Sequence, residues 1–519
     1  MPGSTNPEAN LQSRSAVVGE ARPEAEPGSG LVRRWVEGVE RHPVRFALVF
    51  FVIQIFARMP GLGAESLWLD EAFFLHWSRL PVETIVEIAW TDPNPPLYTL
   101  VLSAWSAIFG ATEVAARSLS VVCMAAAGAL LARAAQRFFS VETALVTAGL
   151  FLTSPLAFHY AREARVYAPV VLIAVASFTL FWGVMRAPSR RGALALGLVE
   201  AIGAYAHFTL LFVFLTQGIA ALLWLRIRPR AFATWLGAQA VAFLLFLPWS
   251  LRVPGNAPRP DDWWLGRPGW REFEAAWEAL AGGWLPMRIG GVLIALALAS
   301  FFFRRPDACA GRRVATVVLW GILTPLLSFV AAQVVPVFLA RYVIFAVPGL
   351  ALLGGWAITS LPGAVWVRGS LALGLIAICA FSIPHVGGIP RSDWRSAAAL
   401  AQEARASGDV VVVQARRHCT PFAYYFASDL FDRQADLPAA LGESGVECLD
   451  DADLPGFRSK PADSRRLLWI RAARRGTPPP EIAAHRPVAL RTLAGIDVIR
   501  YVADGTSQRR RGPASGVLE

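Results

Sequence analysis

The sequence predicts an all-α polytopic membrane bundle of about 11 transmembrane helices, followed by a small C-terminal α/β domain. The charged residues are few: of 519 residues, 55% are hydrophobic and 17% are charged, whereas soluble domains contain about 25% charged residues. The apolar residues also come in repeated runs of membrane-spanning length. The 19 Trp and 31 Phe suit a protein whose aromatic rings gather at the lipid–water boundary.

Eleven apolar runs are predicted to cross the bilayer. They are residues 45–60, 115–136, 140–158, 167–186, 192–206, 208–225, 231–250, 285–303, 314–336, 338–359 and 369–384. A further apolar run, 97–110, is too short, because a helix needs about 20 residues to cross the hydrocarbon core. We therefore expect 97–110 to form a juxtamembrane or re-entrant helix.

The distribution of arginine orients the chain. Arg33, Arg34, Arg41 and Arg45 precede the first span, so the positive-inside rule places the N-terminus in the cytoplasm. If 97–110 does not cross, the other basic loops are also cytoplasmic: 133–137, 186–191, 226–230 and 304–313. If 97–110 crossed, all of these loops would move outside. The net charge of +11 is thus explained by cytoplasmic loops, and no compact basic domain predicts nucleic-acid binding.

This orientation divides the chain into regions. Residues 1–44 are expected to form a disordered cytoplasmic tail, and residues 45–384 the membrane domain, with its first outer loop at 61–114. The extracytoplasmic α/β domain is expected over 385–504, and a second disordered tail over 505–519. In the outer domain we expect a helix at 393–406 and strands at 409–414, 467–470 and 496–501. Cys419 and Cys448 lie in the same domain, where they form a disulfide or remain two free thiols.

Four polar motifs fall on the outer face. They are Ser66-Leu67-Trp68-Leu69-Asp70-Glu71, Asp92-Pro93-Asn94-Pro95-Pro96-Leu97-Tyr98, Tyr160-Ala161-Arg162-Glu163-Ala164-Arg165-Val166-Tyr167 and Arg341-Tyr342. Each alone has an ordinary explanation, such as an acidic loop, a helix start, a charged hairpin or a snorkelling anchor. Together they bring carboxylates and guanidinium groups to one face of the membrane, at the ends of several helices.

Such a set of groups suits sugar transfer from a lipid phosphate. A carboxylate can take the proton from an acceptor hydroxyl, and Arg can hold the phosphate while charge develops on it. The candidate catalytic residues are Asp70, Glu71, Asp92 and Glu163. The candidate donor-phosphate ligands are Arg162, Arg165, Tyr167, Arg341 and Tyr342. The sequence leaves open whether a divalent metal ion takes part.

The motifs also occur in a familiar order. The segments LWLDEAF, DPNPPLY, ARSLSVVCMAAAGALLAR, SPLAFHYAREARVYA and ARYVIFAVPGLALL resemble bacterial members of the GT-C glycosyltransferase superfamily. These are relatives of the protein O-mannosyltransferases and of the lipid A aminoarabinose transferase. The resemblance spans residues 45–360 and implies a helical bundle with juxtamembrane helices in a long first outer loop.

The resemblance also implies roles for individual residues. It makes Asp70 the general base and places Arg162, Arg165, Arg341 and Tyr342 in the donor site. Ser392-Asp393-Trp394-Arg395 resembles the stretch that opens the extracytoplasmic tail of these relatives. One position departs from the pattern, because the relatives usually have His where this chain has Asn94. Asn cannot titrate near neutral pH, so a metal-binding or proton-relay role does not carry over to it.

The expected function is therefore a glycosyltransferase of the bacterial inner membrane. It would move a sugar, with inversion, from a polyprenyl-phosphate donor to a hydroxyl on an acceptor lipid, glycan or protein. The alternative is a polytopic transporter or lipid flippase without transferase activity. Transporters usually show internal repeats and charged groups at mid-membrane, and only Glu200, within a predicted span, favours that alternative.

The arginine pattern makes a testable prediction about topology. Reporter fusions after Arg191, Arg230 and Arg313 should report a cytoplasmic location, because the positive-inside rule retains these loops. A fusion after Gly388 should report the outer side. A cytoplasmic signal from the Gly388 fusion would contradict the predicted orientation.

Overall fold

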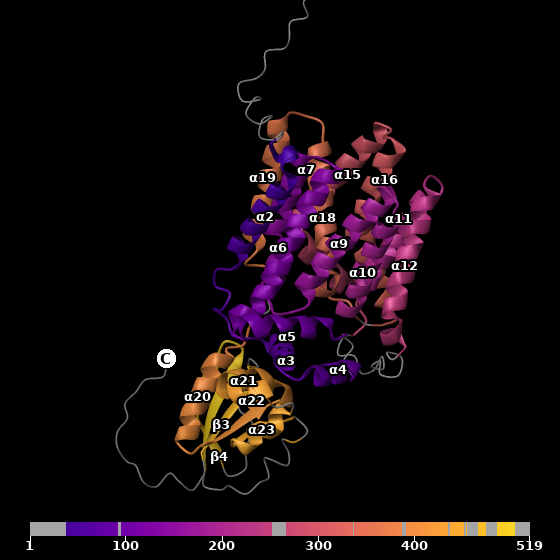
Figure 1. Ribbon diagram of the computed structural model, residues 1–519. Helices are drawn as coiled ribbons and strands as arrows, with labels where there is room; N and C mark the ends of the chain where they lie inside the picture. The colour runs from indigo at the N-terminus through magenta and orange to yellow at the C-terminus, as the bar shows by residue number, and fades with distance from the viewer. Residues whose placement is uncertain are drawn as a thin grey trace, which may run out of the picture.

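The computed structural model describes residues 38–91, 95–251, 266–335, 337–386, 391–433, 436–450, 453, 466–473 and 485–503. Most of the tail predicted at 1–44, all of the tail predicted at 505–519, and Asp92 lie outside these described residues. The described chain forms a long helical bundle with a smaller C-terminal unit at one end (Figure 1).

All eleven runs predicted to cross the membrane are helical. The bundle consists of α2 (Pro43–Arg58), α6 (Glu113–Phe138), α7 (Val141–Thr153), α9 (Tyr167–Arg186), α10 (Arg190–Ala206), α11 (Leu210–Leu225), α12 (Pro229–Ser250), α15 (Trp284–Phe303), α16 (Ala308–Val318) with η3 (Leu319–Leu323) and α17 (Thr324–Ala331), η4 (Ala340–Ala346) with α18 (Val347–Ser360), and α19 (Val365–Ser382). Among the described residues, 7 helical segments are long and apolar enough to cross a membrane. The other four, α2, α7, α10 and α11, have 16, 13, 17 and 16 residues. The chain is therefore a multi-pass membrane protein.

Three short helices lie across one end of the bundle, between the long helices and the C-terminal unit (Figure 1). They are α3 (Leu69–Ser78), α4 (Val82–Thr91) and α5 (Leu97–Phe109). We call this end the capped end. The run 97–110 forms α5 and does not cross the bundle, as predicted. Gly110 has φ +86°, a conformation that suits glycine, and it turns the chain from α5 into α6.

Two further helices complete the capped end. α8 (Pro155–Tyr160) follows α7 after a break at Ser154, whose side chain accepts a hydrogen bond from the Ala157 amide. α14 (Trp270–Ala281) lies in the stretch predicted only as an outer loop, and it packs against η4 and α15. η3 holds η4 in place, because the Trp320 indole in η3 donates a hydrogen bond to the Phe345 carbonyl in η4 at 2.8 Å. This contact fixes the segment that carries Arg341 and Tyr342.

The C-terminal unit is an α/β domain, as predicted. Its sheet has the order β2-β1-β3-β5-β4, with β1 (Val410–Gln414) parallel to β2 (Val446–Leu449) and β3 (Leu467–Ala472), and β5 (Ile496–Ala503) antiparallel to β3 and β4 (His485–Leu493). The helices of the unit are α20 (Trp394–Ala406), α21 (Cys419–Phe426), α22 (Ser428–Arg433) and α23 (Leu437–Glu443).

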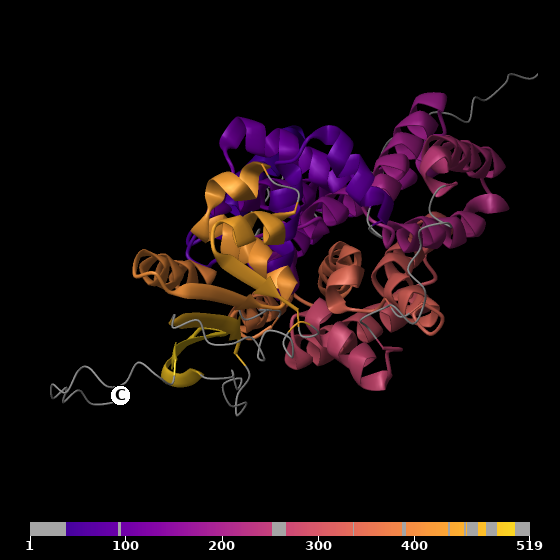
Figure 2. The ribbon, with the colours of Figure 1, turned by 90° about the horizontal axis from the view of Figure 1, so that it is seen from below.

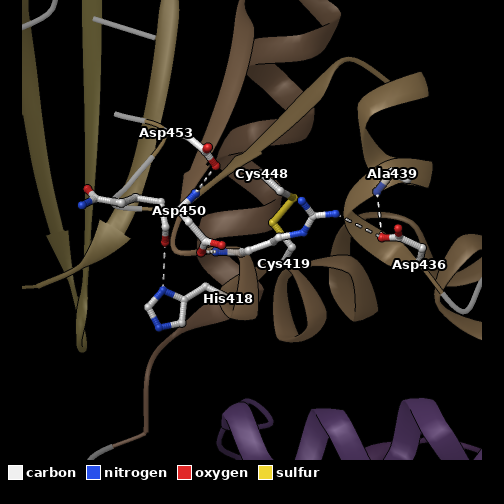
Figure 3. The surroundings of a disulfide bond; sticks show 9 residues. His418, Cys419, Asp436, Ala439, Cys448, Asp450 and Asp453 are labelled. Carbon is white, nitrogen blue, oxygen red and sulfur yellow. Dashed lines mark hydrogen bonds and ion pairs between the residues drawn. A yellow bond between two sulfur atoms is a disulfide. The ribbon is translucent and has the colours of Figure 1, made fainter. Parts of the chain in front are cut away.

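The sequence predicted three of the five strands. It missed β2, which has 4 residues, and β4, an edge strand whose residues are mostly exposed. Cys419 at the start of α21 and Cys448 in β2 form a disulfide (Figure 3), which settles the question that the sequence left open. Viewed from below, the unit overlaps part of the indigo N-terminal segment, and the magenta helices of the middle of the chain lie beside it (Figure 2).

Candidate active site

A buried ion pair between Glu71 and Arg117 organises the capped end. Arg117 Nη2 lies 2.7 Å from Glu71 Oε2, and Arg117 Nε donates to Glu71 Oε1 at 2.8 Å. Both side chains have 0% relative exposure. Two parallel N–H···O bonds of this kind are the strongest geometry available to Arg and a carboxylate. The pair ties α3 to the first turns of α6.

Arg117 also shapes the loop before α3. Its guanidinium donates to the carbonyls of Leu62 at 2.7 Å, Glu65 at 2.9 Å and Ser66 at 3.1 Å. All three nitrogens of the Arg117 guanidinium therefore donate hydrogen bonds, either to this loop or to the Glu71 carboxylate. Arg117 was not among the predicted site residues. One sequence signal could have found it, because an Arg at the predicted outer end of a span opposes the positive-inside bias.

The Glu71 carboxylate is fully occupied. Oε1 also accepts the Ala164 amide at 2.9 Å, and Arg391 Nη1 lies 3.7 Å from Oε2. Burial alone would raise the pKa of this carboxyl, but the Arg117 hydrogen bond, the charges of Arg117 and Arg391 and the Ala164 amide lower it, and the net direction is downward. Glu71 therefore stays charged and paired, with no exposed oxygen to receive a proton from an acceptor.

Asp70, the neighbouring carboxylate, has a different environment. Successive helix residues point about 100° apart, so Asp70 faces away from the Glu71 pair. Its Oδ2 lies 3.3 Å from Arg165 Nη2, and its side chain keeps 27% relative exposure. The Arg165 guanidinium also lies over the Phe74 ring, 4.5 Å from its centroid, and Phe74 is one turn after Asp70. Asp70 is thus an accessible carboxylate beside a fixed cation.

Cationic and aromatic side chains surround this pair. The Arg165 guanidinium lies 5.5 Å from the Tyr167 ring centroid, and the Arg341 guanidinium lies 6.0 Å from that of Trp68 and 5.5 Å from that of Tyr342. Arg341 interacts electrostatically with Asp70. The structure therefore brings together five predicted site residues from three separate motifs: Asp70, Arg165, Tyr167, Arg341 and Tyr342. We call these five residues the Asp70 cluster.

His207, between α10 and α11, lies against this cluster and was not predicted. Its ring centroid is 5.8 Å from that of Tyr342 and 6.2 Å from that of Tyr167. Its Nδ1 is 2.8 Å from the Thr209 hydroxyl. Burial lowers the pKa of His207 to about 3, with further lowering from the charges of Arg165 and Arg341. His207 is therefore a neutral wall of the cluster near pH 7.

The four remaining candidate site residues, Arg162, Glu163, Glu71 and Asp92, are not part of the Asp70 cluster. Arg162 donates to the carbonyls of Arg58 at 2.6 Å and Pro60 at 2.7 Å, so its guanidinium holds the end of α2. Glu163 is buried, with Oε1 3.0 Å from His159 Nε2. Glu71 belongs to the ion pair described above. The fourth, Asp92, falls outside the described residues.

The C-terminal unit contacts the capped end through polar side chains. Arg391 Nε lies 3.1 Å from a Glu65 oxygen, and Arg391 Nη2 donates to the Arg162 carbonyl at 3.3 Å. Arg395 Nη2 donates to Glu113 at 2.6 Å. The Tyr425 hydroxyl accepts the Leu67 amide at 2.7 Å, three residues before Asp70. The unit therefore buttresses the loop that leads into the Asp70 cluster.

The four-residue stretch that opens this unit has separate structural tasks. The Asp393 side chain caps α20 by accepting from the Ser396 amide at 3.0 Å, as Asp does at helix starts. Trp394 is buried, and Arg395 forms the ion pair with Glu113. The stretch therefore both starts the domain and attaches it to α6.

Among the described residues, no group of three or more His, Cys, Asp or Glu side chains could hold a metal ion. Glu200 is fully buried in α10, where it accepts hydrogen bonds from Gln239 at 2.6 Å and Ser177 at 3.3 Å. These neutral partners satisfy the carboxyl within the bundle, so Glu200 is a hydrogen-bonded interior residue of α10.

Comparisons with known proteins agree with this architecture. The profile of the family described as dolichyl-phosphate-mannose-protein mannosyltransferase matches residues 93–251. ArnT from Cupriavidus metallidurans in the apo state is 14% identical, with a TM-score of 0.57 over 88% of this chain and 98% of ArnT. ArnT bound to undecaprenyl phosphate is also 14% identical, with a TM-score of 0.54 over 90% of this chain and 99% of ArnT.

A third solved structure is more distant. The archaeal oligosaccharyltransferase AglB from Archaeoglobus fulgidus, in complex with an inhibitory peptide and a dolichol-phosphate, is 11% identical, with a TM-score of 0.51 over 74% of this chain and 64% of AglB. No curated protein sequence matches this chain. The predicted resemblance is confirmed at the level of the fold, since the chain has the fold of ArnT, and nothing in the comparisons supports a transporter or flippase.

The buried Glu71–Arg117 pair makes a prediction about stability. Glu71→Gln should cost about 3–5 kcal/mol, because it leaves a buried guanidinium unpaired. The matched control is Glu113→Gln, which should cost about 1 kcal/mol or less because its partner Arg395 is half exposed. Thermal unfolding of the purified variants in detergent measures both effects. Similar small shifts in the two variants would show that the buried pair does not hold the capped end together.

Proposed function

We propose that this protein is a membrane glycosyltransferase that moves a sugar from a polyprenyl-phosphate donor to a hydroxyl group of an acceptor. The observation that carries the proposal is Asp70, an accessible carboxylate 3.3 Å from Arg165 at the capped end of a GT-C bundle. The solved relatives support the choice of donor. ArnT has been seen with undecaprenyl phosphate, and AglB with a dolichol-phosphate.

The Asp70 cluster divides the chemistry between two kinds of side chain. Asp70 accepts the proton of the acceptor hydroxyl as that oxygen attacks the sugar. Arg165 and Arg341 bind the donor phosphate and stabilise the negative charge that grows on it as the sugar leaves. One direct displacement of this kind inverts the configuration at the anomeric carbon. Tyr167 and Tyr342 form the aromatic wall beside the two cations.

The Asp70–Arg165 ion pair has a consequence for the order of events. In the free protein, Arg165 neutralises Asp70. A donor phosphate between Arg165 and Arg341 draws the Arg165 guanidinium toward itself, because phosphate offers two oxygens to the planar fork. Donor binding then leaves Asp70 with a weaker cationic partner, which favours proton acceptance. Substrate binding and activation of the base are coupled through one side chain.

An apolar groove in the bundle suits the polyprenyl tail. It has a volume of about 360 Å³ and lies between α7, α14, α15, α18 and α19. Its walls include Trp277, Met287 and Ile294, with Gly290 and Gly291 on α15 leaving the space open. α14, which forms one wall, packs against η4, the segment that carries Arg341. A lipid tail in this groove would start near the phosphate-binding Arg.

The proposal places the capped end on the outer face of the bacterial inner membrane, with the N-terminus in the cytoplasm. The arginine-rich loops lie at the opposite end of the bundle, which supports this orientation. The acceptor is then a lipid, glycan or protein that reaches Asp70 from outside. Glu71 has a positioning role, and Arg162 and Glu163 hold the outer loops. Asp92 remains a second candidate base.

The proton-transfer role of Asp70 can be tested by removing only its basicity. Asp70→Asn keeps the size of the side chain, and it should lower turnover about 100- to 10,000-fold, the usual contribution of a general base. The purified variant is assayed with a polyprenyl-phosphate sugar and an envelope extract as acceptor, after its thermal unfolding is shown to match the parent protein. Near-normal turnover would remove Asp70 as the base and favour Asp92.

The phosphate-binding role is tested by a separate set of variants. Arg165→Gln and Arg341→Gln should each raise the KM for the donor about tenfold or more, because each removes hydrogen bonds to a charged group. Arg162→Gln is the matched control: it removes the same charge from the capped end and should leave the donor KM unchanged. An equal effect in all three variants would mean that the overall positive charge matters, not a defined phosphate site.

A further inference from the structure

A second polar pocket lies at the end of the bundle opposite the capped end. It has a volume of about 250 Å³ and is formed by α6, α9, α11 and α16 together with the turn after α11. The polar and aromatic side chains that line it are three Arg, two Trp and one Cys: Arg186, Arg228, Arg313, Trp182, Trp224 and Cys309. The proposed sugar transfer uses none of these residues, and the long helices separate them from the Asp70 cluster.

The pocket concentrates positive charge without internal neutralisation. None of the three arginines forms an ion pair with an acidic side chain among the described residues. The nearby carboxylate, Asp307, accepts the amides of Cys309 and Ala310 at 2.8 Å and so caps α16. It attracts Arg313 electrostatically but does not pair with it. Three guanidinium groups around one small cavity therefore create a positive potential that attracts an anion from outside the protein.

The geometry of the arginines leaves donors for such an anion. Arg228 Nη1 donates to the Arg186 carbonyl at 2.7 Å, and Arg313 Nη1 donates to the Phe138 carbonyl at 2.7 Å. Arg228 Nη1 also lies 3.4 Å from the Met185 carbonyl. Each guanidinium has five N–H groups, and the contacts of Arg228 and Arg313 each use a single nitrogen, so the other groups remain for a ligand. The side chain of Arg186 forms no hydrogen bond within the described chain and is exposed at the rim.

The pocket walls indicate what carries the anion. The Trp182 and Trp224 side chains are almost fully buried, at 3% and 5% exposure, and they make the inner wall aromatic. On the same helix as Trp224, Leu222 and Leu223 are 58% and 41% exposed, so apolar surface continues outward toward the lipid. A cavity with cations at its mouth and apolar surface beside it fits a headgroup phosphate whose acyl chains lie along the bundle.

We propose that this pocket binds the phosphate of an anionic phospholipid in the membrane leaflet opposite the Asp70 cluster. The positive-inside rule accounts for Arg in loops at this end. It does not account for three guanidinium groups converging on one cavity between helices. A soluble phosphate shares the same chemistry, but it would not use the exposed apolar surface of α11.

Cys309 allows a direct test, because it is an exposed free thiol inside the pocket. The protein is placed in nanodiscs of phosphatidylcholine alone or with phosphatidylglycerol, and N-ethylmaleimide labelling of Cys309 is followed by peptide mass spectrometry. The reagent is uncharged, so the negative surface potential that phosphatidylglycerol adds does not change its local concentration. Labelling should be at least about tenfold slower with phosphatidylglycerol. Each Arg contributes a factor of about five to binding an anionic headgroup, so two arginines together give about 25-fold.

Variants separate a defined site from general attraction. Arg228→Gln/Arg313→Gln should remove the protection, whereas Arg190→Gln/Arg226→Gln should keep it. The control pair loses the same charge from exposed positions at the same end but outside the pocket. Because Arg228 and Arg313 also hold backbone carbonyls, Arg186→Gln provides a gentler test and should reduce the protection by a factor of about three to five.

Three outcomes would overturn the proposal. Equal labelling of the parent protein in both nanodiscs would show that no anionic lipid occupies the pocket. Equal loss of protection in the pocket and control pairs would show that charge at the membrane surface, not the pocket, recruits the lipid. Protection by millimolar inorganic phosphate in phosphatidylcholine nanodiscs would assign the pocket to a soluble anion instead.

Discussion

The buried pair of Glu71 and Arg117 is the interaction on which the architecture of the capped end depends. Two charges with no exposure to solvent are tolerated only when each meets a partner at close range. Arg117 meets this condition with one carboxylate and the carbonyls of Leu62, Glu65 and Ser66. The loop before α3 therefore has a fixed path, and the first turn of α3 has a fixed rotation. The direction in which Asp70 points follows from both.

Adjacent carboxylates on this helix acquire different properties from their surroundings. Glu71 is held in its charged form by buried cationic and amide partners. Asp70 shares a solvent-accessible cluster with Arg165. Divergent environments for two neighbouring acids are a common way for a site to separate a structural charge from a reactive one. The two carboxylates need only be adjacent in sequence, because successive residues of a helix point about 100° apart and so face different surroundings.

The two ends of the bundle differ in the balance of their charges. At the capped end, carboxylates and guanidinium groups are interleaved, and the C-terminal unit adds Arg391 and Arg395 to loops that already carry Glu65 and Glu113. Arg117, Arg165, Arg391 and Arg395 there each lie within 3.3 Å of an acidic side chain. At the opposite end, arginines gather with few acids among them. An interleaved set can both take a proton and hold a phosphate, whereas an all-cationic set can only attract anions.

Sequence alone was sufficient for the elements whose signal is local. All eleven apolar runs are helical, 7 of them in segments long and apolar enough to cross a membrane among the described residues. The short run 97–110 forms a surface helix because of its length, and the regular β-pattern predicted β1, β3 and β5. Asp70, Arg165 and Arg341 could be named as candidates from residue type and membrane side. What lay beyond the sequence was pairing: Glu71 with Arg117 across 46 positions, Cys419 with Cys448 across 29, and Arg162 with the end of α2. The local pattern of apolar residues indicates which face of a segment is exposed to solvent or lipid. Which side chains from distant parts of the sequence are buried against each other is decided only when the helices pack.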